Sequence, residues 1–534
     1  MTVKKTPKPL PQQPRELTGS TRAGRRPSPR LPILRTDPPA ARHATPRALT
    51  PLEQLLLRDS RPGYPICFFL ACDVEGPLDT GRLKAALGGA AGRHPLLCSR
   101  VRDSWWRPAW RPPDTLPEFQ AFPLGAPVPA CGEAGFPWRS IDIRRTSGVR
   151  MVALERDRGV WEVVLMIQHA ACDGLAGLEF FGDVWSRYHG SEAAPFRTPS
   201  RVITRRSDGG KTATESPPLS PSDVAPPLPV EAPSGGDLGG ETARFASFIP
   251  ARIARGPAAP PPSQPEGTGR STLPTGPPLP YLTCGFTPEE TATIKQRAAA
   301  AGASLNDVAI AAVMRAVAAW NADAGHPAHQ IRITMPASLK SPGTRAPACN
   351  DMGYAFLDRT VEPGQDPADL VRSLASASRW IQEHRAAAVF LETLALIDRC
   401  PPLLWLLTRL PLPLSTAVVS FVGNAGPRMR ANVPRDGGCD LPGGLRISAA
   451  RGVPPIRPGT RLGVGLVIYD GRLHVTTITD TPALGPEAAA RLAGAIHAGI
   501  LRCAASLPES SSRPAKSPPG DEPHAPRRPS RDQG

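Results

Sequence analysis

The sequence is poor in aromatic residues, which limits how much of it can form a packed core. Aromatic residues make up only 5% of the 534 residues, whereas there are 68 prolines and 49 glycines. A globular part must therefore share the chain with segments that bury too little apolar surface to fold. At roughly 100–200 residues per domain, the length predicts two folded units and additional unstructured segments.

The sequence also lacks a long apolar run and a secretory leader. Its most apolar stretch, 403–422, is interrupted by Arg409, Pro411 and Pro413, whereas a spanning helix needs ~20 apolar residues. Residues 1–30 alternate basic residues with prolines and have no apolar core of a signal peptide. We therefore expect a cytoplasmic protein. An organelle transit peptide is the open alternative, because this segment is rich in Arg and poor in acids.

The ten cysteines form no recognisable metal-binding pattern. None belongs to a C-x-x-C pair, and none stands with histidines at the spacing of a zinc finger. We expect reduced thiols and no metal site.

Acidic residues are scarce near the N-terminus, and this accounts for much of the positive charge. Residues 1–48 carry a net charge of +9 out of +16 for the chain, which leaves +7 for the other 486 residues. Because the excess is concentrated in one tail, the folded part has no strongly basic composition. We expect no nucleic-acid partner.

Hydrophobic patterning divides the chain into two folded parts, 49–190 and 281–506. Both alternate strand and helix patterns, so the predicted fold class is α/β (α+β). Between them, 191–280 contains nineteen prolines and little hydrophobic periodicity, which predicts a disordered linker. The basic segment 1–48 and the polar segment 507–534 are predicted to be disordered tails.

Apolar runs bounded by capping and turn residues predict the individual elements. Helices are predicted after Thr50 and after Asp79, and over 175–188, 304–320, 367–384 and 486–505. Strands are predicted over 66–74, 96–101, 149–154, 161–168, 331–336 and 417–422, with a hairpin formed by 461–469 and 473–478.

The segment Gln168-His-Ala-Ala-Cys-Asp-Gly joins a predicted strand to a predicted helix. A neutral imidazole at this position, His169, can accept a proton from an attacking hydroxyl or amine. Asp173 is placed to brace the turn through an Arg or a backbone N–H, and Gly174 would permit a positive φ or a close backbone approach. By itself, the H-x-x-x-D-G string can occur by chance, and a single histidine beside a strand usually has only a structural role.

Several segments, in the same order, resemble the chloramphenicol-acetyltransferase-like superfamily. This superfamily includes peptide-synthetase condensation domains, and the resemblance is greatest to its bacterial wax ester synthase/diacylglycerol acyltransferase branch. In the first part the similar segments are Leu49-Thr-Pro-Leu-Glu, Val74-Glu-Gly-Pro-Leu-Asp, Arg93-His-Pro-Leu-Leu-Cys and the His169 segment. In the second part they are Ser304-Leu-Asn-Asp-Val, Met335-Pro-Ala-Ser-Leu, Asn350-Asp-Met-Gly and Tyr469-Asp-Gly-Arg-Leu-His.

This resemblance implies two subdomains, each a mixed sheet with flanking helices, with an active-site tunnel between them. It implies that His169 is the general base for attack on the thioester of acyl-CoA or acyl-pantetheine, which are co-substrates; no cofactor is implied. Ser420 or a backbone N–H is then the candidate donor to the oxyanion. Asn306 and Asp307 are implied to support the site near the subdomain interface, although Ser304 and Asp307 also fit a helix-capping box.

The sequence departs from the family pattern at two places. Gln168 replaces the first of two adjacent histidines, and the segment after Ser420 differs from that of many relatives. The implied function is transfer of an acyl group from acyl-CoA to a hydroxyl acceptor such as a long-chain alcohol or diacylglycerol.

Three alternatives are open. The first is a condensation-type N-acyltransferase with a carrier-bound donor, and the second is a non-catalytic relative that binds an acyl ligand or a partner. The third, compatible with acyl transfer, is peripheral membrane contact through the basic tail and 403–414. The competing interpretation of 403–414 is a buried helix.

Overall fold

The computed structural model describes residues 46–509 except 105–106, 192, 194, 198–278, 327–329, 342, 363, 410–413, 431–439 and 442–443. The predicted linker and the two predicted disordered tails lie almost entirely outside the described residues. At the end of the predicted N-terminal tail, however, Arg47–Ala48 form a short strand, β1. This strand joins a small antiparallel sheet in the order β1-β4-β3.

The first large sheet has six strands in the order β12-β13-β2-β7-β6-β5. Its pairs are antiparallel except β5 with β6, so the sheet is mixed, as predicted. Apolar runs buried on both faces form its centre, which suits strands covered on each side. The strands are β2 (Cys67–Glu75), β5 (Glu118–Phe122), β6 (Val149–Asp157), β7 (Val160–Gln168), β12 (Asp440–Leu441) and β13 (Leu445–Val453).

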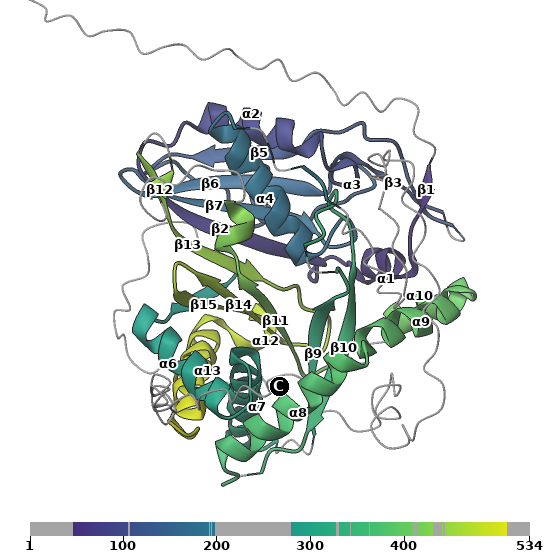
Figure 1. Cartoon of the computed structure of the whole chain (residues 1–534). Coiled ribbons are helices and arrows are strands. Elements are labelled where there is room, and N and C mark those ends of the chain that lie inside the picture. The colour runs from purple at the N-terminus through teal and green to yellow at the C-terminus, as the bar shows by residue number, and fades with distance from the viewer. Residues whose placement is uncertain are drawn as a thin grey trace, which may run out of the picture. The chain divides into compact units, whose positions relative to one another are not determined.

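Two helices pack together along the first sheet, α2 (Thr80–Ala91) and α4 (Gly174–Tyr188) (Figure 1). The α4 backbone lies close to the sheet at Gly177, where an added Cβ would be 3.0 Å from Leu70 and 3.2 Å from Ile167. A larger side chain would push the helix away from β2 and β7, because neighbouring core atoms have little room to move.

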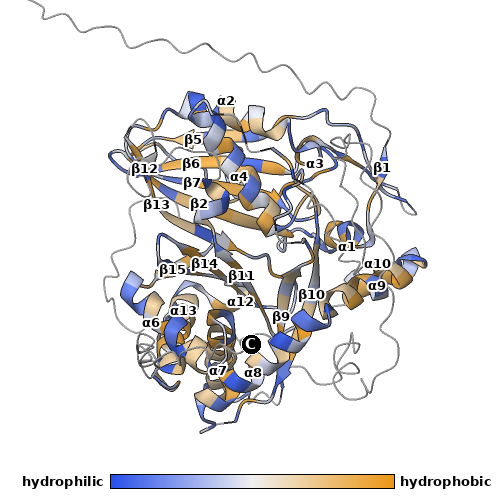
Figure 2. Cartoon of the chain, viewed as in Figure 1, coloured by the Kyte–Doolittle hydropathy of each residue, from blue (hydrophilic) through white to orange (hydrophobic). Residues whose placement is uncertain are grey.

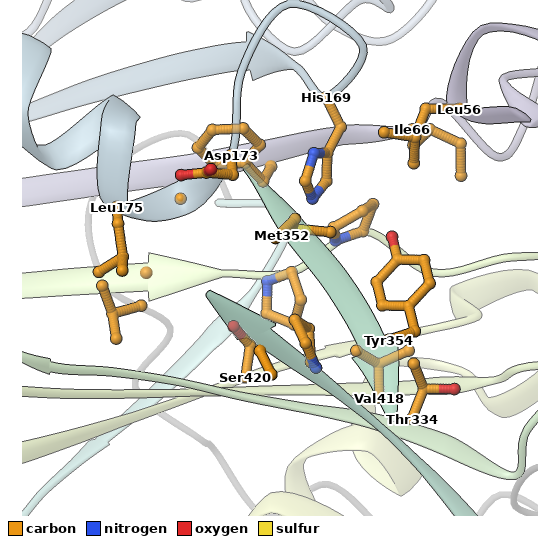
Figure 3. A pocket seen from close by; sticks show the side chains of 18 of the residues that line it. Leu56, Ile66, His169, Asp173, Leu175, Thr334, Met352, Tyr354, Val418 and Ser420 are labelled. Carbon is orange, nitrogen blue, oxygen red and sulfur yellow. The ribbon is translucent and has the colours of Figure 1, made fainter. Parts of the chain in front are cut away.

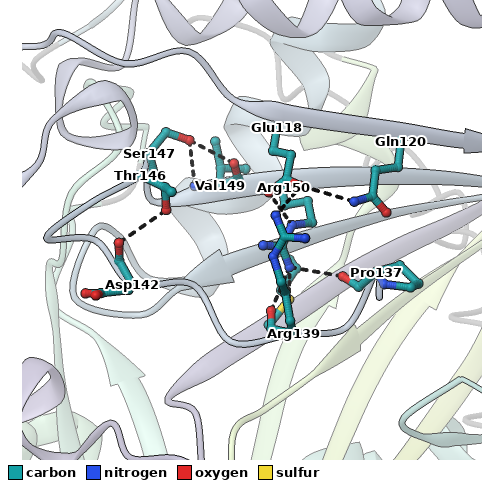
Figure 4. Close-up of polar contacts among 10 residues, drawn as sticks. Glu118, Gln120, Pro137, Arg139, Asp142, Thr146, Ser147, Val149 and Arg150 are labelled. Carbon is teal, nitrogen blue, oxygen red and sulfur yellow. Dashed lines mark hydrogen bonds and ion pairs between the residues drawn. The ribbon is translucent and has the colours of Figure 1, made fainter. Parts of the chain in front are cut away.

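A buried arginine fixes the outer strands of this sheet (Figure 4). Arg150 on β6 donates to Glu118 on β5 at 2.8 Å and to the carbonyls of Pro137 and Arg139 at 3.0 and 2.6 Å. Its guanidinium is therefore paired and hydrogen-bonded, as burial of a charge requires. We assign it a structural role.

The second large sheet also has six strands, in the order β10-β9-β11-β14-β15-β8. It is mixed, because β11 runs parallel to both β9 and β14 while the other pairs are antiparallel. The predicted hairpin through Asp470 and Gly471 is confirmed, and both turn residues have positive φ. The strands are β8 (Leu282–Gly285), β9 (Ile331–Ser338), β10 (Met352–Arg359), β11 (Ala417–Asn424), β14 (Leu462–Tyr469) and β15 (Arg472–Thr479).

A helical layer lies under the second sheet, with its apolar residues facing the sheet and one another (Figure 2). It contains α6 (Pro288–Ala300), α7 (Leu305–Asp323), α8 (Pro367–Glu383) and α13 (Pro486–Ala505). The capping box predicted for α7 is confirmed: Ser304 accepts from the Asp307 N–H, and Asp307 accepts from the Ser304 N–H.

Two strands from the second half of the chain, β12 and β13, belong to the first sheet. β13 lies within the predicted C-terminal subdomain 281–506 but pairs with β2. The predicted subdomain boundaries therefore do not enclose the first sheet completely. Arg451 on β13 donates to Asp73 on β2 at 2.7 Å and to Glu162 on β7 at 2.9 Å. Because two acidic partners are already present in the first sheet, the arginine can be buried there.

The two sheets approach each other closely where β13 passes β14. A Cβ at Gly465 on β14 would lie 1.8 Å from the carbonyl oxygen of Gly452 on β13. That oxygen accepts a hydrogen bond from the Thr476 hydroxyl at 2.5 Å. Only glycine at 465 permits this contact, which joins the two sheets directly.

The predicted strand 96–101 is wrong. Residues Pro95–Cys98 form a short helix, α3, and only Val101–Arg102 form a strand, β3, which pairs with β4 (Ala109–Trp110). Pro95 explains the difference, because its fixed φ suits the first position of a helix. The apolar run is buried in either conformation, so hydrophobicity alone could not distinguish them.

Within the described ranges, the remaining helices are α1 (Pro51–Asp59), α9 (Ala386–Asp398), α10 (Pro401–Arg409), α11 (Gly426–Met429) and α12 (Thr481–Leu484). In the described part of the chain, no single helix is long and apolar enough to span a membrane. The α6–α7 pair meets the length and composition criteria only together and is bent by 97°.

Candidate functional site

The H-x-x-x-D-G segment forms the turn between β7 and α4, as its position in the sequence predicts. The backbone continues the sheet as far as His169, whose N–H donates to the Ile66 carbonyl at 2.9 Å. After that residue the chain leaves the sheet and enters the helix. The His169 side chain is consequently presented at the end of the strand instead of on a sheet face.

Gln168, which replaces the first histidine of the family pattern, stabilises this turn. Its side-chain oxygen accepts from the Ala170 N–H at 2.6 Å, and the side chain is almost fully buried. It does not line the pocket described below. Gln168 therefore contributes a hydrogen bond within the turn, and His169, not Gln168, lines the pocket.

Asp173 braces the turn through backbone N–H groups, and no arginine among the described residues pairs with it. One carboxylate oxygen accepts from Ala176 N at 2.8 Å and caps α4, and the other accepts from Asp351 N at 2.9 Å. The second bond connects the turn to the loop that precedes β10. A carboxylate that accepts two N–H groups is well suited to fix geometry.

Gly174 does not have the role expected from the sequence. It is the first residue of α4, it is not among the glycines with positive φ, and nothing lies within 4 Å of the position of an added Cβ. The glycine instead lines the pocket, where the absence of a side chain leaves space beside Asp173.

A loop from the second subdomain holds the turn from the other side. The side-chain amide of Asn350 donates to the carbonyls of His169 and Ala170, at 2.9 Å each. The sequence offered a signal for this residue in the Asn350-Asp-Met-Gly segment, but it did not show that the amide contacts the His169 backbone.

The same loop is fixed to the first subdomain by a buried histidine. His94 accepts from Ala348 N at 2.9 Å through Nδ1, and its Nε2 lies 3.1 Å from a carboxylate oxygen of Asp183. Arg345 in the loop also pairs with Asp183. These contacts position Asn350 relative to the turn, and sequence patterns alone did not identify them.

The His169 ring faces the pocket with one nitrogen and the protein with the other. The residue is only 7% exposed, and Nδ1 is buried. Figure 3 shows the ring pointing from the turn into the pocket. Nε2 is therefore the nitrogen available to a bound molecule.

Burial also keeps the imidazole in its basic form. It lowers the pKa of His169 below the usual value of 6.5, although the nearby Asp173 carboxylate acts in the opposite direction. The ring is consequently neutral at pH 7 and can accept a proton.

A pocket of about 400 Å³ lies between the two sheets, where the tunnel was expected. Its walls are mainly apolar and come from both subdomains. They include Leu56 and Phe68 from the first, and Met352, Phe356 and Phe390 from the second. A largely apolar cavity with a few polar groups is typical of small-molecule sites.

Hydroxyl groups of the second sheet face His169 across this pocket. Ser420 on β11, Tyr354 on β10 and Thr334 on β9 line it (Figure 3). Burial raises the pKa of Tyr354, and the charge of Asp59 raises it further. The phenol is therefore protonated at neutral pH and can donate a hydrogen bond. Ser420 was predicted from the resemblance, whereas Tyr354 was not identified from the sequence.

Lys340 provides a buried positive charge near the turn. Its side chain is 7% exposed, and Nζ lies 3.9 Å from a Glu179 oxygen. Although burial lowers it, the pKa of Lys340 is raised on balance by the carboxylates of Asp173 and Glu179. Among the described residues, no three His, Cys, Asp or Glu side chains are grouped so that they could bind a metal ion.

Asn306 and Asp307 lie outside the pocket lining. Asp307 accepts a hydrogen bond from the Ser378 hydroxyl at 2.6 Å in addition to capping α7, and the Asn306 amide contacts the Met335 sulfur at 3.4 Å. These contacts attach α7 to α8 and β9. In this structure both residues stabilise the second subdomain.

Comparison with known proteins gives two distant curated relatives. No protein-family model matches the chain. Two uncharacterised proteins from different strains of Mycobacterium tuberculosis are each 24% identical over 469 residues, which cover 85% of this chain and 98% of theirs.

Solved structures with a similar fold include condensation domains. The first condensation domain of the CDA synthetase has a TM-score of 0.54 at 16% identity, covering 87% of this chain and 98% of that domain. The condensation domain of the Monacolin K polyketide synthase MokA also has a TM-score of 0.54, at 11% identity, covering 86% and 98%. The starter condensation domain of the rhizomide synthetase RzmA, solved with C8-CoA, has a TM-score of 0.53 at 15% identity, covering 88% and 97%.

Proposed function

We propose that this chain, which has the two-subdomain fold of condensation domains, is an acyltransferase with His169 as its general base. The finer proposal is O-acyl transfer from acyl-CoA to a hydroxyl acceptor such as a long-chain alcohol or diacylglycerol. It would place the chain functionally with the wax ester synthase/diacylglycerol acyltransferase branch of the chloramphenicol-acetyltransferase-like superfamily.

The orientation and basicity of His169 carry this proposal. Nε2 faces an apolar pocket between the sheets, the imidazole is neutral because burial lowers the pKa of His169, and the turn is fixed by Asp173 and Asn350. A base that is oriented before substrate binds needs little reorganisation when the proton moves.

In the proposed reaction, Nε2 accepts the proton of the acceptor hydroxyl while its oxygen attacks the thioester carbonyl. The C–S bond then breaks, and the imidazolium returns its proton to the thiolate, so that an ester and a free thiol are formed. The proposal requires no covalent intermediate with the protein, and CoA or pantetheine acts as a co-substrate.

The negative charge of the tetrahedral intermediate requires a hydrogen-bond donor. Ser420 and Tyr354 are the candidates, because both hydroxyls line the pocket on the sheet opposite His169. The apolar walls suit a hydrocarbon chain on the donor or the acceptor, since burial of each CH₂ is favourable by about 0.8 kcal/mol.

The test is thiol release from palmitoyl-CoA, measured with hexadecanol, dioleoylglycerol or hexadecylamine as acceptor. We expect acceptor-dependent release by the wild type and a loss of ~10²–10⁴-fold in kcat/KM for His169→Ala. His326→Ala is the matched control, because His326 is exposed and outside the pocket lining.

Other outcomes distinguish the alternatives. Release with the amine but not with the alcohols would favour amide formation, and release only from an acyl-pantetheine carrier would favour the condensation-type enzyme. Binding of acyl-CoA without release by any route would favour a non-catalytic acyl-binding protein. Full activity of His169→Ala would exclude the role given to this residue.

A further inference from the structure

Exposed apolar side chains are concentrated on one pair of helices. Nine large apolar residues are exposed in the described part of the chain, and five of them lie on α9 and α10. These are Val389, Leu396, Leu403, Trp405 and Leu406, which are 38–63% exposed. Figure 2 shows the same two helices as an apolar projection beside the second sheet.

The segment 403–414 is therefore not simply a buried helix, as one interpretation of the sequence expected. Up to Arg409 it forms α10, which buries Leu404 and Thr408 and exposes Leu403, Trp405 and Leu406. Residues 410–413 lie outside the described residues. An apolar face that is repeated on two consecutive helices suggests a binding surface, whereas isolated exposed leucines do not.

The opposite face of α9 belongs to the candidate active site. Phe390 on α9 is buried and lines the pocket, while Val389 and Leu396 on the same helix are exposed. The helix lies close against β10, because a Cβ at Gly353 would be 1.9 Å from the Ala387 carbonyl oxygen. A single helix thus separates the apolar pocket from the exposed apolar surface.

Charge identifies the kind of surface that would complement this face. Arg399 and Arg409 are exposed on it, and the Arg409 guanidinium lies 5.9 Å from the centre of the Trp405 ring. Glu392 on α9 is an exposed acidic residue, whereas Asp398 is half-buried and accepts a hydrogen bond from Gln54 at 2.9 Å. The exposed arginines therefore outnumber the exposed carboxylate, and leucine and tryptophan beside arginine are typical of helices that bind at the interface of anionic membranes.

We propose that the outer face of α9 and α10 docks onto the surface of an anionic lipid bilayer. The apolar side chains would enter the boundary between head groups and acyl chains, and Arg399 and Arg409 would contact lipid phosphates. The proposal goes beyond the acyl transfer proposed above and does not depend on it, because binding can be measured without turnover.

The test is co-sedimentation of the full-length chain with vesicles of phosphatidylcholine alone or of phosphatidylcholine with phosphatidylglycerol. We expect binding to the anionic vesicles, and at least a tenfold lower partition coefficient for the double variant Leu396→Asp/Leu403→Asp. Both side chains are exposed, so these substitutions leave the core unchanged. The matched control is Leu116→Asp/Leu124→Asp, which introduces the same charges at two exposed leucines elsewhere.

A second variant tests the charge component separately. Arg399→Gln/Arg409→Gln should weaken binding to anionic vesicles several-fold, and this difference should diminish at high salt because the contacts are electrostatic.

The proposal is overturned if the two leucine double variants bind equally well, because another part of the chain would then be responsible for binding. It is also overturned if the wild type binds no vesicles, or if it self-associates in analytical ultracentrifugation and Leu396→Asp/Leu403→Asp makes it monomeric. In the last case the face would be an interface between two copies of the chain.

Discussion

The two six-stranded sheets contribute different chemistry to the same pocket. The first sheet ends in the turn that carries His169 and Asp173, and both of these titratable residues line the pocket. The second sheet presents the hydroxyls of Thr334, Tyr354 and Ser420 opposite them. The base and the candidate hydrogen-bond donors therefore lie on different subdomains, and the reaction proposed above requires both.

This difference shows why the subdomains must be rigidly connected. The proton acceptor and the oxyanion donor have to remain within hydrogen-bonding distance of one substrate, and errors of about 1 Å are costly. The Asn350 loop, the passage of β13 into the first sheet and the contact at Gly465 all restrict movement between the sheets.

The different roles of the two sheets are tested most strongly by removing hydroxyls from the second sheet. If a hydroxyl donates to the oxyanion, Ser420→Ala or Tyr354→Phe should lower kcat by ~10²–10³-fold while KM changes little. Steady-state kinetics of both variants would identify the donor. If kcat is unchanged in both variants, the donor is a backbone N–H. The proposal that the first sheet supplies the base and the second sheet the donor would then be wrong.

A smaller effect is expected from loosening the connection between the subdomains. Asn350→Ala removes two hydrogen bonds to the turn, so we expect kcat to fall about tenfold with His169 still present, because the base is less well positioned. Asn306→Ala is the matched control, since its amide contacts Met335 and not the His169 turn, so kcat should stay unchanged. Equal losses in both variants would indicate a general effect on folding.

The smallest effect is expected in the pH dependence of kcat/KM, which tests only the base carried by the first sheet. Because burial lowers the pKa of His169, the base stays neutral as the pH falls to 6.5, and kcat/KM should decline only below that value. The profile of kcat/KM between pH 8 and pH 5 measures this directly. An acidic limb centred above 6.5 would contradict the lowered pKa.

Stability should respond to pH in the same direction. Burial also lowers the pKa of His94, and it lowers the pKa of His474 to about 4. Near pH 6.5 the unfolded chain therefore binds protons at these histidines, whereas the folded chain does not. The free energy of unfolding should consequently decrease as the pH falls below 6.5. Urea unfolding at pH 7.5 and 5.5 would show the difference.

The sequence predicted the position of the H-x-x-x-D-G turn because the signals there are local. An apolar strand precedes it, and Asp173 is a capping residue immediately before an amphipathic helix. The fold class and the central strands of both sheets followed from similar local patterns.

What the sequence could not predict depends on contacts between distant residues. β13 was missed because Arg446 and Arg451 interrupt its apolar pattern, and burial of Arg451 is acceptable only beside Asp73 and Glu162. Tyr354 was missed because β10 is recognisable mainly through its pairing with β9. The contacts of Asn350 depend on a loop whose position is set by His94 and Asp183.

The position of β13 late in the sequence also determines when the first sheet can be completed during synthesis. Arg451 lies 378 residues after its partner Asp73, so β2 leaves the ribosome long before the strand that will cover its edge. Until then, the N-terminal sheet has an unpaired edge and two acidic side chains without their arginine. Open edges promote aggregation, so we expect the nascent N-terminal half to depend on chaperones until β13 has been synthesised.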